Sequence, residues 1–212
     1  AEKVTAFHHT LEHVIKASRT RGKVIAHVGA VATGDSVALA RHAEEVGADA
    51  VASIPPFAYG RSLAGARAHY RSLAHATDLP LFLYNIPSLT AVNLSAEDVR
   101  ELVELPHVQG LKFSDYNIFE ERRIIAIRED LDILHGVDET LLYALMSGAR
   151  GGVGLTYNFI PRVIVAIYNL YQAGEIEEAN RLQLRVSAMV SQFIHLSSGN
   201  MVGLAKGVMS SL

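Results

Sequence analysis

Short apolar segments alternate with helical patterns along most of this 212-residue chain. Glycine, proline and other turn-forming residues bound each apolar segment, and each is too short for a helix, so we predict buried strands. The strands are expected at residues 23–28, 50–54, 81–85, 110–114, 132–136 and 151–156. Helices are expected at residues 1–20, 37–46, 63–76, 95–105, 118–128 and 139–146, and after Pro161 at 163–172, 176–196 and 201–212. This alternation is typical of βα units around a parallel sheet.

Several residues are expected to mark the ends of these helices. Asp35 or Ser36 could cap the helix at 37–46. Ser95 is the expected N-cap of the helix at 95–105, with Asp98 at the capping-box position.

Two parallel-sheet architectures produce this pattern, the doubly wound sheet and the (β/α)8 barrel. A nucleotide-binding doubly wound fold is disfavoured, because no Gly-x-Gly-x-x-Gly motif follows a predicted strand and no Gly-x-x-x-x-Gly-Lys-Ser/Thr motif occurs. In a barrel, polar residues at the carboxyl ends of the strands are the candidates for chemistry. Here these residues are His27, Tyr84, Asn85, Lys112, Ser114, Asp138 and Thr156.

Lys112 is unusual in this group because it lies within an apolar strand. Side chains alternate along a strand, so Leu111 and Phe113 point one way and Lys112 points the other, between small neighbours. A poorly solvated ammonium has a lowered pKa, which lets an amine attack a carbonyl near neutral pH. The alternative is a lysine at a strand end whose charged group reaches water.

Composition and charge narrow the possible functions. Half of the residues are hydrophobic, so we expect one domain over residues 1–212, with a C-terminal helical extension from about residue 175. The net charge is −3 with both signs mixed along the chain, which predicts neither nucleic acid nor a membrane as partner. The absence of cysteine excludes disulfides, thiolate catalysis and cysteine-based zinc sites. No signal-peptide pattern is found, and a cytoplasmic location is expected.

Four motifs in collinear order resemble those of the N-acetylneuraminate lyase and dihydrodipicolinate synthase superfamily. They are Tyr84-Asn85-Ile86-Pro87, Gly110-Leu111-Lys112-Phe113-Ser114-Asp115, Gly136-Val137-Asp138-Glu139 and Gly152-Val153-Gly154-Leu155-Thr156-Tyr157-Asn158. The resemblance covers nearly the whole chain. It implies a (β/α)8 barrel, a lyase with class I aldolase chemistry through a lysine Schiff base with pyruvate, no metal or other cofactor, and usually a homotetramer.

The resemblance also implies catalytic roles for two residues. Lys112 would be the Schiff-base lysine, and Tyr84 the phenol that relays the proton when the carbon–carbon bond breaks or forms. The imine is an electron sink for the carbanion that develops on the pyruvate methyl carbon. Without the resemblance, a lone strand tyrosine is more often a packing residue whose hydroxyl bonds to the backbone. Ala58 stands near where some relatives carry a second tyrosine of the relay, and Tyr59 is adjacent.

Within the superfamily, the motifs resemble most closely the N-acetylneuraminate lyase branch. Dihydrodipicolinate synthases generally have an arginine shortly after Tyr-Asn-x-Pro that holds a substrate carboxylate. Here Ser88, Leu89 and Thr90 follow Pro87. This difference argues against the synthase.

The resemblance implies further contacts to the sugar part of the substrate. Asp138 and Glu139 resemble the lyase pair that accepts hydrogen bonds from sugar hydroxyls. Gly136 and Gly154 resemble backbone contacts to the same ligand, and Ser114 would face the sugar chain beside the lysine. Acidic residues at a helix N-terminus also offset the helix dipole, and this alternative stays open for Glu139.

Leu155 departs from the family pattern, because sialic acid lyases commonly place a sugar-binding serine there. An apolar side chain cannot supply that hydrogen bond, which favours shorter or less hydroxylated 2-keto acids. Two enzymatic functions therefore stay open. The first is cleavage of a 2-keto sugar acid such as N-acetylneuraminate to pyruvate and an aldehyde sugar, a reaction of carbohydrate metabolism. The second is a pyruvate-dependent lyase or dehydratase reaction on a smaller 2-keto-3-deoxy acid.

Two strands of the family have no counterpart in this sequence. They normally precede the helix at 1–20, and the second carries a Gly-Ser/Thr-Thr-Gly-Glu loop that binds the pyruvate carboxylate. Six strands cannot close an eight-stranded barrel, so we expect a (β/α)8 barrel whose first two strands are missing from this chain. A polypeptide that begins at Ala1 is expected to have weak or absent catalysis. A third hypothesis is therefore a non-catalytic barrel that binds a ligand or a partner subunit.

Overall fold

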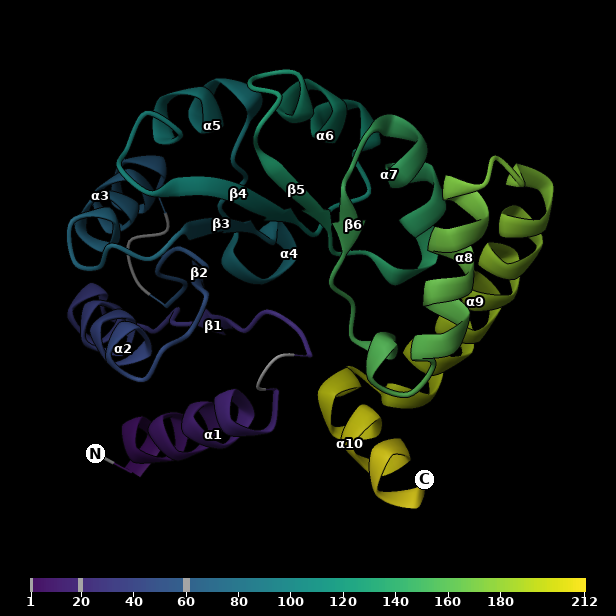
Figure 1. Cartoon of the computed structure of the whole chain (residues 1–212), viewed down its shortest axis with the longest axis horizontal. Helices are drawn as coiled ribbons and strands as arrows, with labels where there is room; N and C mark the ends of the chain where they lie inside the picture. Colours follow the sequence, from purple (N-terminus) through teal and green to yellow (C-terminus); the bar gives the residue numbers. More distant parts are fainter. Residues whose placement is uncertain (1, 19–20, 59–61) are drawn as a thin grey trace. The chain divides into compact units, whose positions relative to one another are not determined.

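The computed structural model describes residues 2–18, 21–58 and 62–212, and it shows an α/β fold in which strands alternate with helices (Figure 1). The strands in this part of the chain are β1 (Ile25–His27), β2 (Ala50–Ser53), β3 (Leu81–Asn85), β4 (Val108–Phe113), β5 (Asp132–His135) and β6 (Gly151–Gly152). They form one sheet in the order β1-β2-β3-β4-β5-β6. The pairs β1·β2, β2·β3 and β5·β6 are parallel. The predicted parallel sheet of βα units is thus confirmed.

Each predicted helix has a counterpart in the structure, with shifted ends. The α-helices are α1 (Glu2–Ser18), α2 (Thr33–Glu45), α3 (Leu63–Ala74), α4 (Pro87–Thr90), α5 (Ala96–Leu102), α6 (Ile118–Ile125), α7 (Leu141–Ser147), α8 (Pro161–Gln172), α9 (Ile176–Ser197) and α10 (Met201–Ser211). Two 3-10 helices are η1 (Asp138–Thr140) and η2 (Thr156–Asn158). The short helix α4 was not predicted. Residues 1, 19 and 20 of the first predicted helix, and Tyr59, lie outside the described residues.

The prediction that the last strand extends to Thr156 is wrong. Strand β6 ends at Gly152, and Thr156 begins η2. The backbone N–H of Thr156 donates to a carboxylate oxygen of Asp138 at 2.6 Å, so it is not available to a neighbouring strand. The helix predicted at 139–146 also begins differently, as the 3-10 turn η1 followed by α7.

The predicted cap of α2 is wrong as well. The helix starts at Thr33, and its N-cap residue is Ala32, which makes no side-chain cap bond. Ser36 lies inside the helix, and its buried hydroxyl accepts a hydrogen bond from the Ala30 N–H at 3.0 Å. Asp35 lies in the first turn, where its charge offsets the helix dipole.

The predicted capping box of α5 is confirmed. The Ser95 hydroxyl accepts from the Asp98 N–H at 3.2 Å, and the Asp98 carboxylate accepts from the Ser95 N–H at 3.0 Å. Arg67 of α3 donates to the same carboxylate at 2.8 Å. Burial alone would raise the pKa of Asp98, but the hydrogen bonds from Ser95 and Arg67 outweigh it and lower that pKa below its usual value.

The chain forms two compact units, each described here by itself. Unit 1 comprises Ala1–Leu111 and Ile127–Leu131, and unit 2 comprises Lys112–Ala126 and Asp132–Leu212. The expectation of one domain over residues 1–212 stays a prediction. No helix in the described part of the chain is long and apolar enough to cross a membrane.

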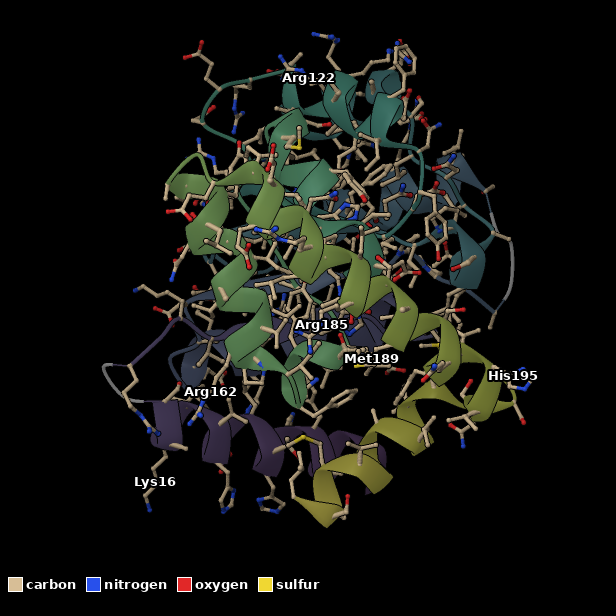
Figure 2. The ribbon with its side chains drawn as sticks, turned by 90° about the vertical axis from the view of Figure 1, so that its right-hand side faces the viewer. Lys16, Arg122, Arg162, Arg185, Met189 and His195 are labelled. Atoms are coloured by element: carbon tan, nitrogen blue, oxygen red, sulfur yellow. The ribbon has the colours of Figure 1, made fainter. Side chains whose placement is uncertain are left out.

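The core of unit 2 lies between α7, α8 and α9, and Figure 1 shows α8 and α9 side by side. Figure 2 shows Arg185, Met189 and His195 spaced along α9; Met189 packs against the core, whereas the other two are exposed. The buried members of this core are Leu141, Leu142, Leu145, Ile164, Ile167, Ala179, Val186 and Val190.

A buried polar network in unit 1 surrounds His69 of α3. The Ser53 hydroxyl donates to the carbonyl of Ile54 at 2.8 Å, so it accepts from His69 Nε2–H at 2.8 Å. His69 Nδ1 is then the acceptor for the Thr33 hydroxyl, at 3.0 Å. With a neutral imidazole, the side chains of Thr33, Ser53 and His69 all have hydrogen-bond partners. Burial lowers the pKa of His69 to about 4.

We expect the free energy of unfolding to decrease as pH falls from 6.5 toward 4. In this range the unfolded chain binds a proton at His69 and the folded chain does not, so protonation favours unfolding, by about 3 kcal/mol in total. Urea unfolding at a series of pH values measures this. His69→Gln should flatten the dependence, while Ser53→Ala, which keeps the buried imidazole, should retain it. An unchanged slope in His69→Gln would contradict the assignment.

Candidate active site

Lys112 lies half-buried near the end of β4, with Gly136 beside it. A methyl group added at Gly136 would lie 3.0 Å from Lys112 Cε and would overlap the Ser114 hydroxyl. That hydroxyl donates to the Gly136 carbonyl at 3.4 Å, and the Gly136 N–H donates to the Phe113 carbonyl at 2.7 Å. Lys112 and Ser114 thus meet the same glycine, as the alternation along the strand predicts. Glycine at this position lets the Lys112 and Ser114 side chains pack against the backbone at residue 136.

Asp138 is buried in the turn that follows β5, with 7% of its surface exposed. Its Oδ2 accepts from both the N–H and the hydroxyl of Thr156, each at 2.6 Å. A side chain at Gly154 would overlap the same carboxylate. The glycine therefore allows the segment after β6 to approach Asp138, and two donors compensate a carboxylate that has left water.

Glu139 is half-buried next to Asp138 and is held at both its backbone and its side chain. Its carbonyl accepts from the Ser187 hydroxyl of α9 at 2.8 Å, and its Oε1 accepts from the Tyr116 hydroxyl at 2.5 Å. The hydrogen bond to Glu139, followed by burial and the negative charges of Glu139 and Asp138, raises the pKa of Tyr116 to about 12. Tyr116 is nevertheless 65% exposed, so this pair lies at the surface of unit 2.

Leu155 and Tyr157 flank Thr156 in the segment after β6. Leu155 is half-buried; its carbonyl accepts from Asn158 Nδ2 at 2.8 Å, and its side chain has no polar atom. The Tyr157 hydroxyl is buried and has no hydrogen-bond partner within the described residues. Burial, followed by the charges of Asp138 and Glu139, raises the pKa of Tyr157 well above its ordinary value.

Tyr84 lies on β3 of unit 1. Its ring meets His27 edge-on, with 5.8 Å between the ring centroids. Its N–H donates to the Tyr70 hydroxyl at 3.3 Å, and this buried hydroxyl donates in turn to the Ser53 carbonyl at 2.9 Å. Tyr70 of α3 therefore fixes the backbone of β3 at Tyr84. The relay role of Tyr84 stays a prediction.

Asn85, the other polar residue at the end of β3, has a role within unit 1. Its Oδ1 accepts from the Leu94 N–H at 3.0 Å, and its Nδ2 donates to Asn93 Oδ1 at 3.1 Å. The amide is buried and holds the loop before α5.

The remaining predicted residues lie on three segments of unit 2: Lys112 and Ser114 meet Gly136, and Asp138 meets Gly154. Sequence reasoning missed Tyr116 and Tyr157 as residues next to the acidic pair. Tyr116 follows Lys112 and Ser114 at the same spacing of two, a signal that could have found it.

Chemically, the arrangement offers an amine with small neighbours and two carboxylates as hydrogen-bond acceptors. In the ranges 2–18, 21–58 and 62–212, no group of three His, Asp or Glu side chains could hold a metal ion.

Comparison with known proteins gives consistent matches. The model of the dihydrodipicolinate synthetase family matches residues 5–210. The N-acetylneuraminate lyase of Rhizobium meliloti strain 1021 is 38% identical over 184 residues, which is 87% of this chain and 61% of that protein. This chain therefore spans less than two thirds of that relative's length.

Two solved structures extend the comparison. The structure of CdNal from Clostridium difficile in complex with mannosamine has a TM-score of 0.83 and 27% identity, covering 91% of this chain and 65% of that one. A prophage protein of the dihydrodipicolinic acid synthase family from E. coli K12, solved with pyruvate, shares the fold with a TM-score of 0.91. It is 22% identical and covers 98% of this chain and 70% of that one.

We expect Gly154→Ala to destabilise the protein by about 1–3 kcal/mol, because the new methyl group would push the Asp138 carboxylate away from Thr156. Gly151→Ala is the matched control. Its methyl group would meet only Leu134, at an ordinary contact distance of 3.9 Å, so a change within about 0.5 kcal/mol is expected. Chemical denaturation measures both. Equal stability of the two variants would show that Asp138 tolerates a side chain at position 154.

Proposed function

The chain belongs to the dihydrodipicolinate synthetase family, and on that premise we propose that it carries the Schiff-base lysine of a class I aldolase. The proposed substrate is a 2-keto sugar acid such as N-acetylneuraminate, and the products are pyruvate and an aldehyde sugar. The observation that carries the proposal is Lys112 at the end of β4, beside Gly136 and next to the turn that bears Asp138 and Glu139. The 38% sequence identity to the Rhizobium meliloti lyase supports the choice of substrate class.

The proposed reaction proceeds through a covalent intermediate on Lys112. The amine attacks the C2 carbonyl of the substrate, and loss of water gives a protonated imine. The C4 hydroxyl then loses its proton through Tyr84, the aldehyde forms at C4, and the C3–C4 bonding electrons move to C3 as an enamine. Protonation of C3 and hydrolysis of the imine release pyruvate and restore the amine. No metal or further cofactor is part of this proposal.

The two carboxylates are proposed to accept hydrogen bonds from sugar hydroxyls. Thr156 occupies Oδ2 of Asp138, and Tyr116 occupies Oε1 of Glu139. Each carboxylate thus has one oxygen that these bonds do not use. Charged acceptors held in one orientation bind hydroxyl groups more strongly than neutral ones.

Leu155 favours a second candidate in the same family, a pyruvate-dependent lyase or dehydratase acting on a smaller 2-keto-3-deoxy acid. Its side chain cannot hydrogen-bond a sugar hydroxyl, so the extra hydroxyls of a longer substrate would lose a partner. A (β/α)8 barrel whose first two strands are missing from this chain, a homotetramer and a cytoplasmic location belong to both candidates as predictions.

Incubation with pyruvate followed by borohydride should leave a covalent adduct on the peptide that contains Lys112, detected by mass spectrometry. Lys112→Ala should abolish the adduct. Lys206→Ala removes an exposed lysine of α10 and should leave it unchanged. An adduct on another lysine, or none on the full-length protein, would refute the Schiff-base assignment. An adduct missing only from residues 1–212 would agree with the expected loss of the carboxylate-binding loop.

A panel of 2-keto acids separates the two candidates, and Leu155→Ser tests the basis of the choice. We expect this substitution to raise kcat/KM for N-acetylneuraminate, relative to a six-carbon 2-keto-3-deoxy acid, by up to about tenfold, the worth of one added hydrogen bond. Leu155→Ala provides the same space without the hydroxyl. The explanation fails if both variants give the same gain.

A further inference from the structure

Three alternate side chains of the segment 112–116 meet the turn at residues 136–139. Lys112 and Ser114 both meet Gly136, and the Tyr116 hydroxyl donates to Glu139 Oε1 at 2.5 Å. The three residues therefore form a row that begins at the amine and ends at an exposed phenol.

The distance from Lys112 to Tyr116 along this row can be compared with the length of the substrate. An extended chain advances about 3.3 Å per residue, so the Tyr116 Cα lies at most about 13 Å from the Lys112 Cα. A substrate joined to the amine adds at most about 1.5 Å for each carbon–carbon bond. A nine-carbon acid therefore reaches further along the row than a six-carbon acid.

Resting on the function proposed above, in which Glu139 accepts a sugar hydroxyl, we propose that Tyr116 binds a distal hydroxyl of a long sugar acid and determines the preferred chain length. The phenol oxygen keeps lone pairs that accept a sugar hydroxyl, while its proton holds the Glu139 carboxylate. Tyr116 thereby supplies, at the far end, a polar group that compensates for the apolar Leu155.

The electrostatics agree with this role. The hydrogen bond to Glu139 raises the pKa of Tyr116 to about 12, so the phenol is protonated at neutral pH. The phenol therefore stays a donor to Glu139, and the carboxylate keeps one orientation.

The experiment compares Tyr116→Phe with the unmodified protein on N-acetylneuraminate and on a six-carbon 2-keto-3-deoxy acid. Tyr143→Phe is the matched control, since it removes an exposed phenol of α7 that donates to Asn180 at 3.3 Å. We expect Tyr116→Phe to raise KM for the nine-carbon acid about tenfold, with kcat and both constants for the six-carbon acid unchanged. Tyr143→Phe should leave all four constants unchanged.

A binding measurement provides a second readout that does not need turnover. An analogue of N-acetylneuraminate that lacks the C4 hydroxyl, and so cannot be cleaved, should compete with pyruvate for borohydride trapping at Lys112, and Tyr116→Phe should weaken this competition about tenfold. Equal changes for both acids, or no change, overturn the inference and leave the proposed function intact. Absence of any pyruvate adduct in the unmodified full-length protein overturns the proposed function, and this inference with it.

Discussion

Asp138 lies buried with its Oδ2 accepting two hydrogen bonds from Thr156, each 2.6 Å long. A carboxylate that leaves water is costly unless strong donors replace the lost hydration, and these two bonds supply such donors. Gly154 makes the contact possible, because any side chain there would overlap the carboxylate. The interaction joins the turn after β5 to the segment after β6. It also explains why Thr156 is not part of β6, since its N–H is directed to the carboxylate and not to the sheet.

The helix α9 holds the same turn from another side. Gln183 is fully buried; its amide nitrogen donates to the Asp138 carbonyl at 3.2 Å, and its amide oxygen accepts from the Leu142 N–H at 2.9 Å. One side chain thereby binds the carbonyl of η1 and an N–H in the first turn of α7, a group that has no partner within its own helix. The hydroxyl of Ser187, one turn later, donates to the Glu139 carbonyl. The C-terminal helical segment is therefore part of the support of the candidate site.

Strands, and contacts between residues close in the sequence, could be predicted from the sequence. Contacts between residues far apart in the sequence could not. The strands follow from apolar runs between turn residues, and the capping box of Ser95 and Asp98 involves residues only three apart. The position of Thr156 outside the sheet depends on its bond to Asp138, 18 residues earlier, and the bonds of Gln183 to Asp138 and Leu142 span 45 and 41 residues. No local pattern encodes such partners. The positions of Lys112, Tyr84, Ser114 and Asp138 at strand ends made them candidates from the strand pattern alone, whereas their individual roles came from motif resemblance.

Polar contacts orient the turn at residues 136–140, and apolar packing alone would not fix that orientation. Glu121 of α6 and His135 of β5 are fully buried; both carboxylate oxygens lie 3.0 Å from His135 Nδ1, and His135 Nε2 lies 2.8 Å from the Thr140 hydroxyl. Burying such a pair carries a desolvation cost that apolar side chains would avoid, so what the pair adds is orientation. Residues 136–140 are thus fixed by polar contacts from α6, α9 and the segment after β6. The Asp138 carboxylate is held by two hydrogen bonds, while Lys112 has a glycine and a serine beside it, so neighbouring segments of unit 2 carry a fixed acceptor and the amine.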